Sequence, residues 1–130
     1  MYRHEITEIA PHTWCLSEFR LVNAFLIEGE EKAALVDTGC GIGDLAGEVR
    51  ALTDKPLIIL LTHTHFDHDG GVFEFPGVPV YVNPLDGEHA EKITRIWKSS
   101  WAPQITTRCA GSIFSLVGLF AARIWIRKNC

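Results

Sequence analysis

Apolar and polar residues alternate over short stretches in the first third of the chain. Alternation with a period of two is typical of β-strands, because successive side chains of an extended chain point to opposite faces. Residues 6–16 alternate loosely, and we predict one or two strands there with a turn at Pro11 and His12. We predict two further strands over 23–28 and 33–36, joined by the polar, glycine-containing loop 28–32.

The apolar spacing becomes helical after residue 43. Leu45, Val49 and Leu52 share one face of a helix predicted over 44–53. This helix ends before Pro56, because the residue before a proline avoids the helical conformation. The rest of the pattern predicts a buried strand over 57–61, a short helix from 72 to 75, a strand over 78–82, and a helix that opens at Asn83-Pro84. Strands that alternate with helices predict the α/β fold class.

Four metal-ligating side chains follow the predicted strand 57–61 directly. They are His63, His65, Asp67 and His68. His63, His65 and Asp67 are spaced by two, so they share one face if the backbone stays extended, whereas His68 points elsewhere. Two diverging groups of imidazole and carboxylate suit a pair of zinc, iron or manganese ions better than a single calcium ion. The alternative is a polar loop with incidental histidines, which this density of ligands disfavours.

Two other features of the sequence bear on this site. Gly70 and Gly71 follow it, and we expect them to let the backbone turn tightly around it. His12 and His89 are the other histidines beyond the first residues of the chain. We interpret His12 as a surface turn residue, and His89 as a packed or rim residue on an apolar helical face.

The sequence Thr62-His63-Thr64-His65-Phe66-Asp67-His68 matches the HxHxDH signature of the metallo-β-lactamase superfamily. Val36-Asp37-Thr38-Gly39 resembles the strand-end aspartate motif of the same family, and the resemblance covers about residues 5–100. It implies an αββα sandwich, of which this chain would build the N-terminal αβ half. Relatives that reduce oxygen at a di-iron centre usually carry glutamate where this chain has His65, so the resemblance favours the hydrolases.

The resemblance also implies a role for each residue of the motif. His63 and His65 would bind the first metal, while Asp67 and His68 would bind the second. Asp37 would support the metals without touching them. From the residues alone, Asp37 ends an apolar strand and needs a partner there. That partner is either the N–H of a metal-bound histidine or the following loop, which the carboxylate would cap; with the resemblance included we favour the histidine.

The function implied by the resemblance is metal-dependent hydrolysis of an ester, thioester, lactone or amide in a small-molecule substrate, with zinc as the expected metal. A metal-activated water would attack the carbonyl carbon. Asp67 would be the catalytic residue that orients this water or accepts a proton. The competing interpretation is a non-catalytic module that binds metal, a membrane or a protein partner.

Composition narrows the class of protein further. The 130 residues suit one domain, and a net charge of −4 argues against nucleic-acid binding. The four cysteines, which show no CxxC spacing, are Cys15, Cys40, Cys109 and Cys130. Met1–Glu5 is not followed by the apolar core of a secretory signal, so we expect reduced thiols and a cytoplasmic location.

The pattern changes near residue 100, and we divide the chain into a domain over 1–100 and an apolar tail over 101–130. The apolar run 109–122 is shorter than the roughly 20 residues that span a bilayer. We favour a core or surface-adhering helix there and expect membrane contact and self-association. No histidine follows His89 and no acid follows Glu91, so we expect a truncated site that lacks the family's later ligands.

Overall fold

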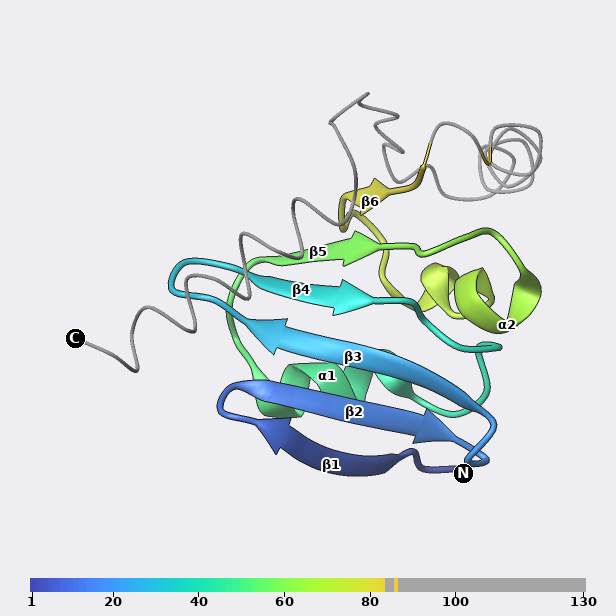
Figure 1. Cartoon of the computed structure of the whole chain (residues 1–130), viewed down its shortest axis with the longest axis horizontal. Coiled ribbons are helices and arrows are strands. Elements are labelled where there is room, and N and C mark those ends of the chain that lie inside the picture. Colours follow the sequence, from blue (N-terminus) through green and yellow to red (C-terminus); the bar gives the residue numbers. More distant parts are fainter. Residues whose placement is uncertain (84–85, 87–130) are drawn as a thin grey trace.

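The computed structural model describes residues 1–83 and 86 (Figure 1). These residues include the sheet and the loops that place the histidine motif. The helix predicted from Asn83-Pro84, His89, the boundary near residue 100 and the apolar run 109–122 lie outside the described residues. In the described part, no helix is long and apolar enough to cross a membrane.

Within the described residues, six strands form one sheet, in the order in which they occur along the chain. The first four pair antiparallel, whereas β4 with β5 and β5 with β6 pair parallel. The predicted strands and the turn at Pro11 and His12 are confirmed, but the last strand is shorter than the predicted 78–82. The strands are β1 (Glu5–Ala10), β2 (Thr13–Glu18), β3 (Val22–Glu28), β4 (Ala33–Val36), β5 (Leu57–Leu60) and β6 (Val80–Tyr81).

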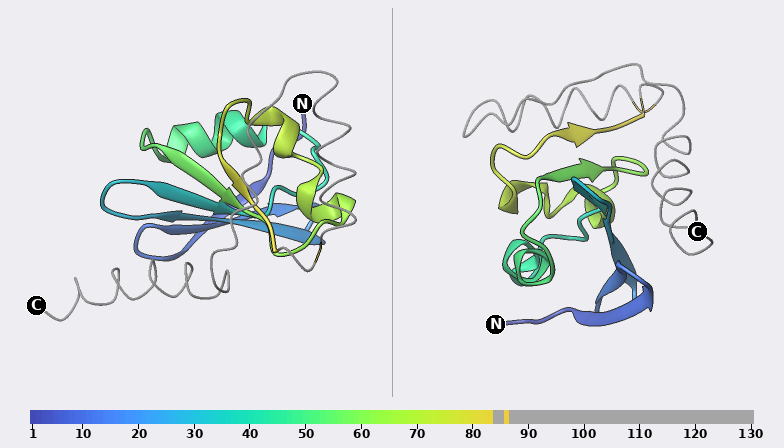
Figure 2. Two further views of the ribbon diagram at one scale, coloured as in Figure 1. Left: turned by 90° about the horizontal axis from the view of Figure 1, so that it is seen from above. Right: turned by 90° about the vertical axis from the view of Figure 1, so that its left-hand side faces the viewer.

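Helix α1 (Leu45–Leu52) is the crossover between the parallel strands β4 and β5, and it lies along one face of the sheet (Figures 1 and 2). Leu35 of β4 and Ile59 of β5 pair in register, and both are fully buried. They belong to the same core as Leu45 and Val49 of the helix. The core comprises Leu16, Ala24, Leu26, Ala33, Leu35, Leu45, Val49, Leu57, Ile59, Leu61, Val72, Phe75, Val80 and Val82.

The parallel pairing decides where the polar motifs meet. The carboxyl ends of β4 and β5 lie at the same edge of the sheet, beside the short helix α2 (Phe66–Asp69) (Figure 1). Asp37 follows β4, and the histidine motif follows β5. A 3-10 helix, η1 (Val72–Glu74), then leads toward β6 and takes the place of the short helix predicted over 72–75.

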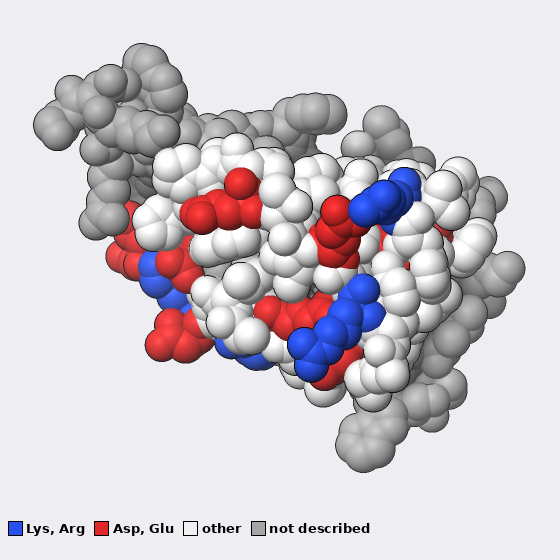
Figure 3. Space-filling view, turned by 90° about the horizontal axis from the view of Figure 1, so that it is seen from below, with Lys and Arg blue, Asp and Glu red and all other residues white. Residues whose placement is uncertain are grey.

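Strand β1 is the outermost strand on the side of the sheet away from β6, and its six residues are all exposed. Glu5 of this strand pairs with Arg20 at 2.7 Å. Figure 3 views the molecule from the side of this edge and shows acidic and basic side chains interspersed on that face, with no continuous basic patch. Charged side chains on an edge strand discourage pairing with another chain.

The N-terminus of α1 has a side-chain cap. The carboxylate of Asp44 accepts a hydrogen bond from the Gly47 amide at 2.9 Å, and Leu45 and Val49 are buried behind it. Such a cap satisfies one of the amides that a helix leaves without a partner in its first turn. The helix predicted over 44–53 is therefore confirmed, with Asp44 as its N-terminal cap and not as a residue of its first turn.

Replacing Asp44 tests this cap. Asp44→Ala should lower the free energy of unfolding by about 1 kcal/mol, because the first turn loses an acceptor. Asp44→Asn should cost much less, since asparagine caps helices as well as aspartate does. Urea denaturation followed by circular dichroism measures both changes. Equal losses for the two variants would contradict the capping role.

Glu74 ties η1 to the same helix. Its Oε2 accepts a hydrogen bond from the Ala46 amide at 3.1 Å, while Oε1 is buried without a hydrogen-bond partner among the described residues. Burial raises the pKa of the Glu74 carboxyl above its ordinary value of 4.5, although the amides of Ala46 and Leu45 act in the opposite direction. The folded state therefore holds this proton more tightly than the unfolded chain does.

This shift has a consequence for stability. As the pH rises from 4.5 through the raised pKa of Glu74, the unfolded chain releases the proton first, so the contribution of Glu74 to stability falls. The difference in unfolding free energy between wild type and Glu74→Gln should therefore decrease over this window and stay constant above it. Urea titrations at closely spaced pH values measure it. A difference that increases with pH would show that the sign is wrong.

Candidate metal centre

The backbone does not stay extended through the histidine motif. Strand β5 ends at Leu60, and His65 still has extended angles of φ −94° and ψ 151°. Helix α2 begins at the next residue, and the His65 carbonyl accepts from the amides of His68 and Asp69 at 2.8 and 2.9 Å. The predicted alternation of three ligands on one extended face is therefore wrong, because Asp67 and His68 lie on a helical turn.

This turn brings the imidazole rings together. The ring centroid of His63 lies 4.7 Å from that of His65 and 4.0 Å from that of His68. The Asp67 carboxylate lies next to the group, with Oδ2 3.5 Å from Nε2 of His68. His68 therefore turns back toward His63 instead of diverging from it, and the four predicted ligands form one cluster.

Asp37 connects this cluster to the end of β4. The side chain is buried, and its carboxylate accepts hydrogen bonds from the Thr62 amide and the Thr62 hydroxyl, both at 2.8 Å. Its Oδ2 also lies 2.9 Å from Nδ1 of His68. Asp37 has a φ of 60°, a left-handed conformation that aspartate tolerates better than most residues. Among the described residues, the carboxylate therefore contacts a ring nitrogen of a motif histidine, the alternative we favoured, and it holds the backbone of the loop after β5 instead of the loop that follows Asp37.

These hydrogen bonds determine which imidazole nitrogens carry protons. The Thr62 hydroxyl gives its proton to Asp37, so its oxygen is an acceptor for Nδ1 of His63, 3.0 Å away. Nδ1 of His68 lies 2.9 Å from Oδ2 of Asp37, and an ionised carboxylate can only accept, so this pairing places the proton on Nδ1. Nδ1 of each ring is therefore engaged by a hydrogen bond, so Nε2 is the nitrogen that would bind a metal; in His68 this atom also lies 3.5 Å from Oδ2 of Asp67.

Close backbone packing holds α2 against the loop after β4. The His68 carbonyl accepts from the Thr38 amide at 2.7 Å and from the Thr38 hydroxyl at 3.0 Å. A Cβ on Gly71 would collide with the Thr38 carbonyl oxygen. Gly70 and Gly71 have φ values of −59° and −89°, which any residue adopts. The glycine pair is therefore needed for this close approach and not, as we predicted, for a tight turn.

Two acids that the sequence patterns did not single out lie beside the cluster. The Asp86 carboxylate accepts from the Thr64 amide at 2.6 Å. Burial raises the pKa of the Asp69 carboxyl, and the negative charges of Asp67 and Asp86 raise it further. Asp86 follows the predicted helix start at Asn83-Pro84, and no spacing in the sequence connects it to the histidines.

In residues 1–83 and 86, no group of three or more His, Cys, Asp or Glu side chains converges on a point where it could hold a metal ion. The described part of the chain thus presents a cluster of suitable donors and not a complete coordination shell. The metal-binding roles of His63, His65, Asp67 and His68 remain predictions.

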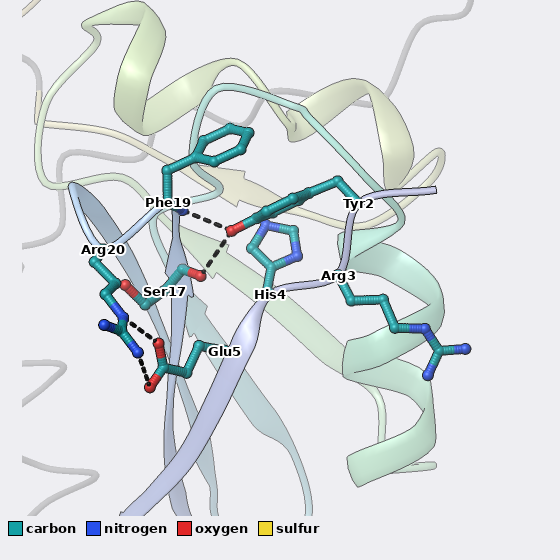
Figure 4. Close-up of a pocket in the computed structure, with 7 residues that line it drawn as sticks. All are labelled: Tyr2, Arg3, His4, Glu5, Ser17, Phe19 and Arg20. Carbon is teal, nitrogen blue, oxygen red and sulfur yellow. Dashed lines mark hydrogen bonds and ion pairs between the residues drawn. The ribbon is translucent and has the colours of Figure 1, made fainter.

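A pocket of about 330 Å³ lies elsewhere, at the N-terminal end of β1 (Figure 4). The Tyr2 hydroxyl donates to the Ser17 carbonyl and accepts from the Phe19 amide at the edge of this pocket. None of its lining residues belongs to the histidine motif. They are Tyr2, Arg3, His4, Glu5, Ser17, Phe19 and Arg20.

Comparison with known proteins identifies the family of the chain. The sequence profile of the metallo-beta-lactamase superfamily matches residues 18–127, which is most of the chain. The chain belongs to the metallo-beta-lactamase superfamily. The resemblance inferred from the histidine and aspartate motifs is thereby confirmed.

A curated relative and two solved structures of this superfamily define the extent of the similarity. The acyl-coenzyme A thioesterase MBLAC2 of Bos taurus is 35% identical over 71 residues, which cover 45% of this chain and 25% of that protein. The chain therefore matches about a quarter of the length of this relative.

The metallo-beta-lactamase from Pontibacter korlensis superposes with a TM-score of 0.61 at 22% identity, over 85% of this chain and 54% of that one. The metallo-beta-lactamase FIM-1 from Pseudomonas aeruginosa, solved in a mono-zinc form, gives a TM-score of 0.55 at 22% identity over 70% of this chain and 46% of its own. At these identities the similarity shows the fold, and the predicted partial α/β sandwich of the metallo-beta-lactamase superfamily is confirmed.

The hydrogen bonds of Asp37 predict how replacing this residue changes the affinity of the chain for zinc. Asp37→Asn keeps the shape of the side chain but removes the charge that holds the His68 N–H. Zinc affinity should fall by about 10–100-fold, the usual effect of removing a partner of a metal-binding histidine. Competition with a chromophoric chelator measures the affinity, with the exposed Asp54→Asn as the control. Unchanged affinity with a lower melting temperature would show that Asp37 only caps the loop.

Proposed function

We propose that this chain is the metal-binding part of a zinc-dependent hydrolase that acts on thioesters. The observation that carries the proposal is a series of hydrogen bonds that connects His63 to Thr62, Thr62 to Asp37, and Asp37 to His68. These bonds engage Nδ1 of two neighbouring imidazoles, so that Nε2 of each ring is the nitrogen that would bind a metal at the carboxyl ends of the parallel strands β4 and β5. In open α/β sheets this edge is where ligands usually bind.

The donors present suit zinc in their chemistry. Imidazole nitrogen and carboxylate oxygen are ordinary zinc ligands, and metal-binding histidines usually donate their second N–H to a carboxylate or carbonyl. His68 donates in this way to Asp37. His63 and His65 would hold one ion, and Asp67 and His68 a second. Zinc is typical of this superfamily, and the FIM-1 structure is a zinc form.

When bound, zinc supplies a Lewis acid that lowers the pKa of a water molecule to about 7 and polarises a carbonyl. The part that we assign to Asp67 is to orient this water and to accept a proton on a carboxylate oxygen. Its side chain is 37% exposed, so the carboxylate can reach solvent and substrate. Asp37 keeps the His68 ring in its tautomer and orientation.

The choice of thioesters, among the carbonyl compounds that such a site could attack, is supported by the relative from Bos taurus, which is named as an acyl-coenzyme A thioesterase. It shares 35% identity with the chain over 71 residues. The net charge of −4 argues against a nucleic-acid substrate and does not select among small-molecule carbonyl compounds.

The metal and the reaction are tested together. Wild type, prepared without a histidine tag, should bind zinc and release thiol from an acyl-coenzyme A until a chelator is added. The double variant His63→Ala, His65→Ala should lose both properties. His12→Ala is the matched control, because this histidine lies in an exposed turn and contacts Glu28 instead of the motif. Equal zinc content in the wild type and the double variant would refute the proposal.

We expect the isolated 130-residue chain to turn over slowly. A catalytic zinc usually has three protein ligands, and the motif offers two to each ion. A misplacement of about 1 Å can cost on the order of 100-fold in rate, so a deficit of at least that size relative to a full-length thioesterase is expected.

The second candidate is a metal-binding module without catalysis. One observation favours it over catalysis: no three donors in the described part of the chain form a group that could hold a metal ion, whereas a catalytic zinc typically has three protein ligands. Zinc binding that depends on His63 and His65, together with thioester hydrolysis no faster than in buffer, would select this alternative.

A further inference from the structure

The loop that carries His63 and His65 is held by carboxylates after the regular sheet has ended. The last backbone hydrogen bonds of β5 run from the Asp37 amide to the Leu60 carbonyl and from the Leu61 amide to the Tyr81 carbonyl, at 3.0 and 2.9 Å. Beyond them, side chains from the segments that follow β4 and β6 accept hydrogen bonds from the amides of the loop.

Each neighbour of β5 contributes one carboxylate. From the β4 side, Asp37 accepts from the Thr62 amide at 2.8 Å. From the β6 side, Asp86 accepts from the Thr64 amide at 2.6 Å. The two amides are alternate residues of the loop, and His63 lies between them while His65 follows directly. The backbone on both sides of His63 is therefore restrained by side chains from the segments that follow two different strands, β4 and β6.

The bond to Asp86 matters because Thr64 is buried. The residue is 5% exposed, and its hydroxyl oxygen has no hydrogen-bond partner among the described residues. A buried amide without an acceptor is unfavourable, so the loop would move to satisfy the Thr64 amide if Asp86 were removed. Such a movement would displace both adjacent histidines. Asp86 is itself held by a turn in which its amide donates to the Asn83 carbonyl at 3.0 Å.

We propose that Asp86 is a positioning residue of the metal centre: its carboxylate holds the Thr64 amide and thereby keeps the imidazoles of His63 and His65 at their observed spacing. This inference rests on the proposed function, because the spacing has a use only if these rings share a metal ion. It assigns to the segment after β6 a direct part in building the site.

The test compares Asp86→Ala and Asp86→Asn in the full 130-residue chain, with Zn²⁺ as the probe. Asp86→Ala should weaken zinc binding by about 10–100-fold, as expected for a group that orients a metal ligand. Asp86→Asn should stay within a few-fold of wild type, because the amide oxygen can still accept from Thr64. The matched control is Asp44→Ala, which removes a carboxylate from the Gly47 amide far along the chain from the motif. It should lower the melting temperature and leave zinc affinity unchanged.

A second measurement needs no metal. In the metal-free protein, the Thr64 amide should exchange with deuterium faster in Asp86→Ala than in wild type, whereas Asp44→Ala should leave it unchanged. If wild type binds no zinc, the proposed function is wrong, and the hold of Asp86 on the loop is then decided by this exchange rate alone.

The outcomes that overturn the proposal are specific. Equal zinc affinity of wild type and Asp86→Ala would overturn it. Unchanged deuterium exchange at the Thr64 amide in Asp86→Ala would also overturn it, and so would zinc binding by Asp86→Asn that is as weak as that of Asp86→Ala. If Asp86→Ala does not fold, Asp86→Glu decides: it keeps the charge and the acceptor but shifts them by one methylene group. We expect zinc binding about 10-fold weaker than wild type for this variant, at the lower end of the same range. Unchanged affinity would refute the positioning role.

Discussion

The buried carboxylate of Asp37 is the constraint on which the candidate site depends. A charge is stable at the end of a buried strand only if its oxygens are satisfied, and here Thr62 and His68 satisfy them. These two residues come from the loop after β5 and from helix α2. The carboxylate can therefore keep its hydrogen bonds only when β4, β5 and α2 are all in place, and these bonds fix the orientation of the His68 ring.

The antiparallel half of the sheet supports this arrangement through the loop after β4. Glu18, at the end of β2, is 2% exposed and accepts from the Cys40 amide at 2.9 Å. A Cβ on Gly39, which has a φ of 64°, would collide with the Glu18 carboxylate. The loop after β4 is thus held between Glu18 on one side and the backbone of Gly70 and α2 on the other. Support for the histidines therefore extends to residues that no metal ion would touch.

The fold was predictable where local chemistry decides it. Strands β2, β3 and β4 follow one another along the chain, and short turns join these strands. Helix α1 has a side-chain cap and an apolar face. Prediction was poorer beyond Leu61. The spacing of apolar and polar residues in the motif does not distinguish an extended backbone from a single helical turn, and the structure has such a turn at Phe66–Asp69. There the amides of His68 and Asp69 find an acceptor in the His65 carbonyl, and this hydrogen bonding outweighs the alternation of the ligands.

By itself, the sequence determined the family, the bounds of β3, β4 and β5 to within one residue, and the presence of four clustered metal-ligating residues after a buried strand. It left open whether Asp37 contacts a histidine or the loop, and it carried no sign of Asp86 or Glu18. Only the tertiary structure decided these points. The hydrogen bonds concerned join residues that are 31 positions apart for Asp37 and His68, and 22 apart for both Thr64 with Asp86 and Glu18 with Cys40. Contacts at such separations depend on how strands pair and on where a crossover returns the chain, and no local pattern of residues encodes them.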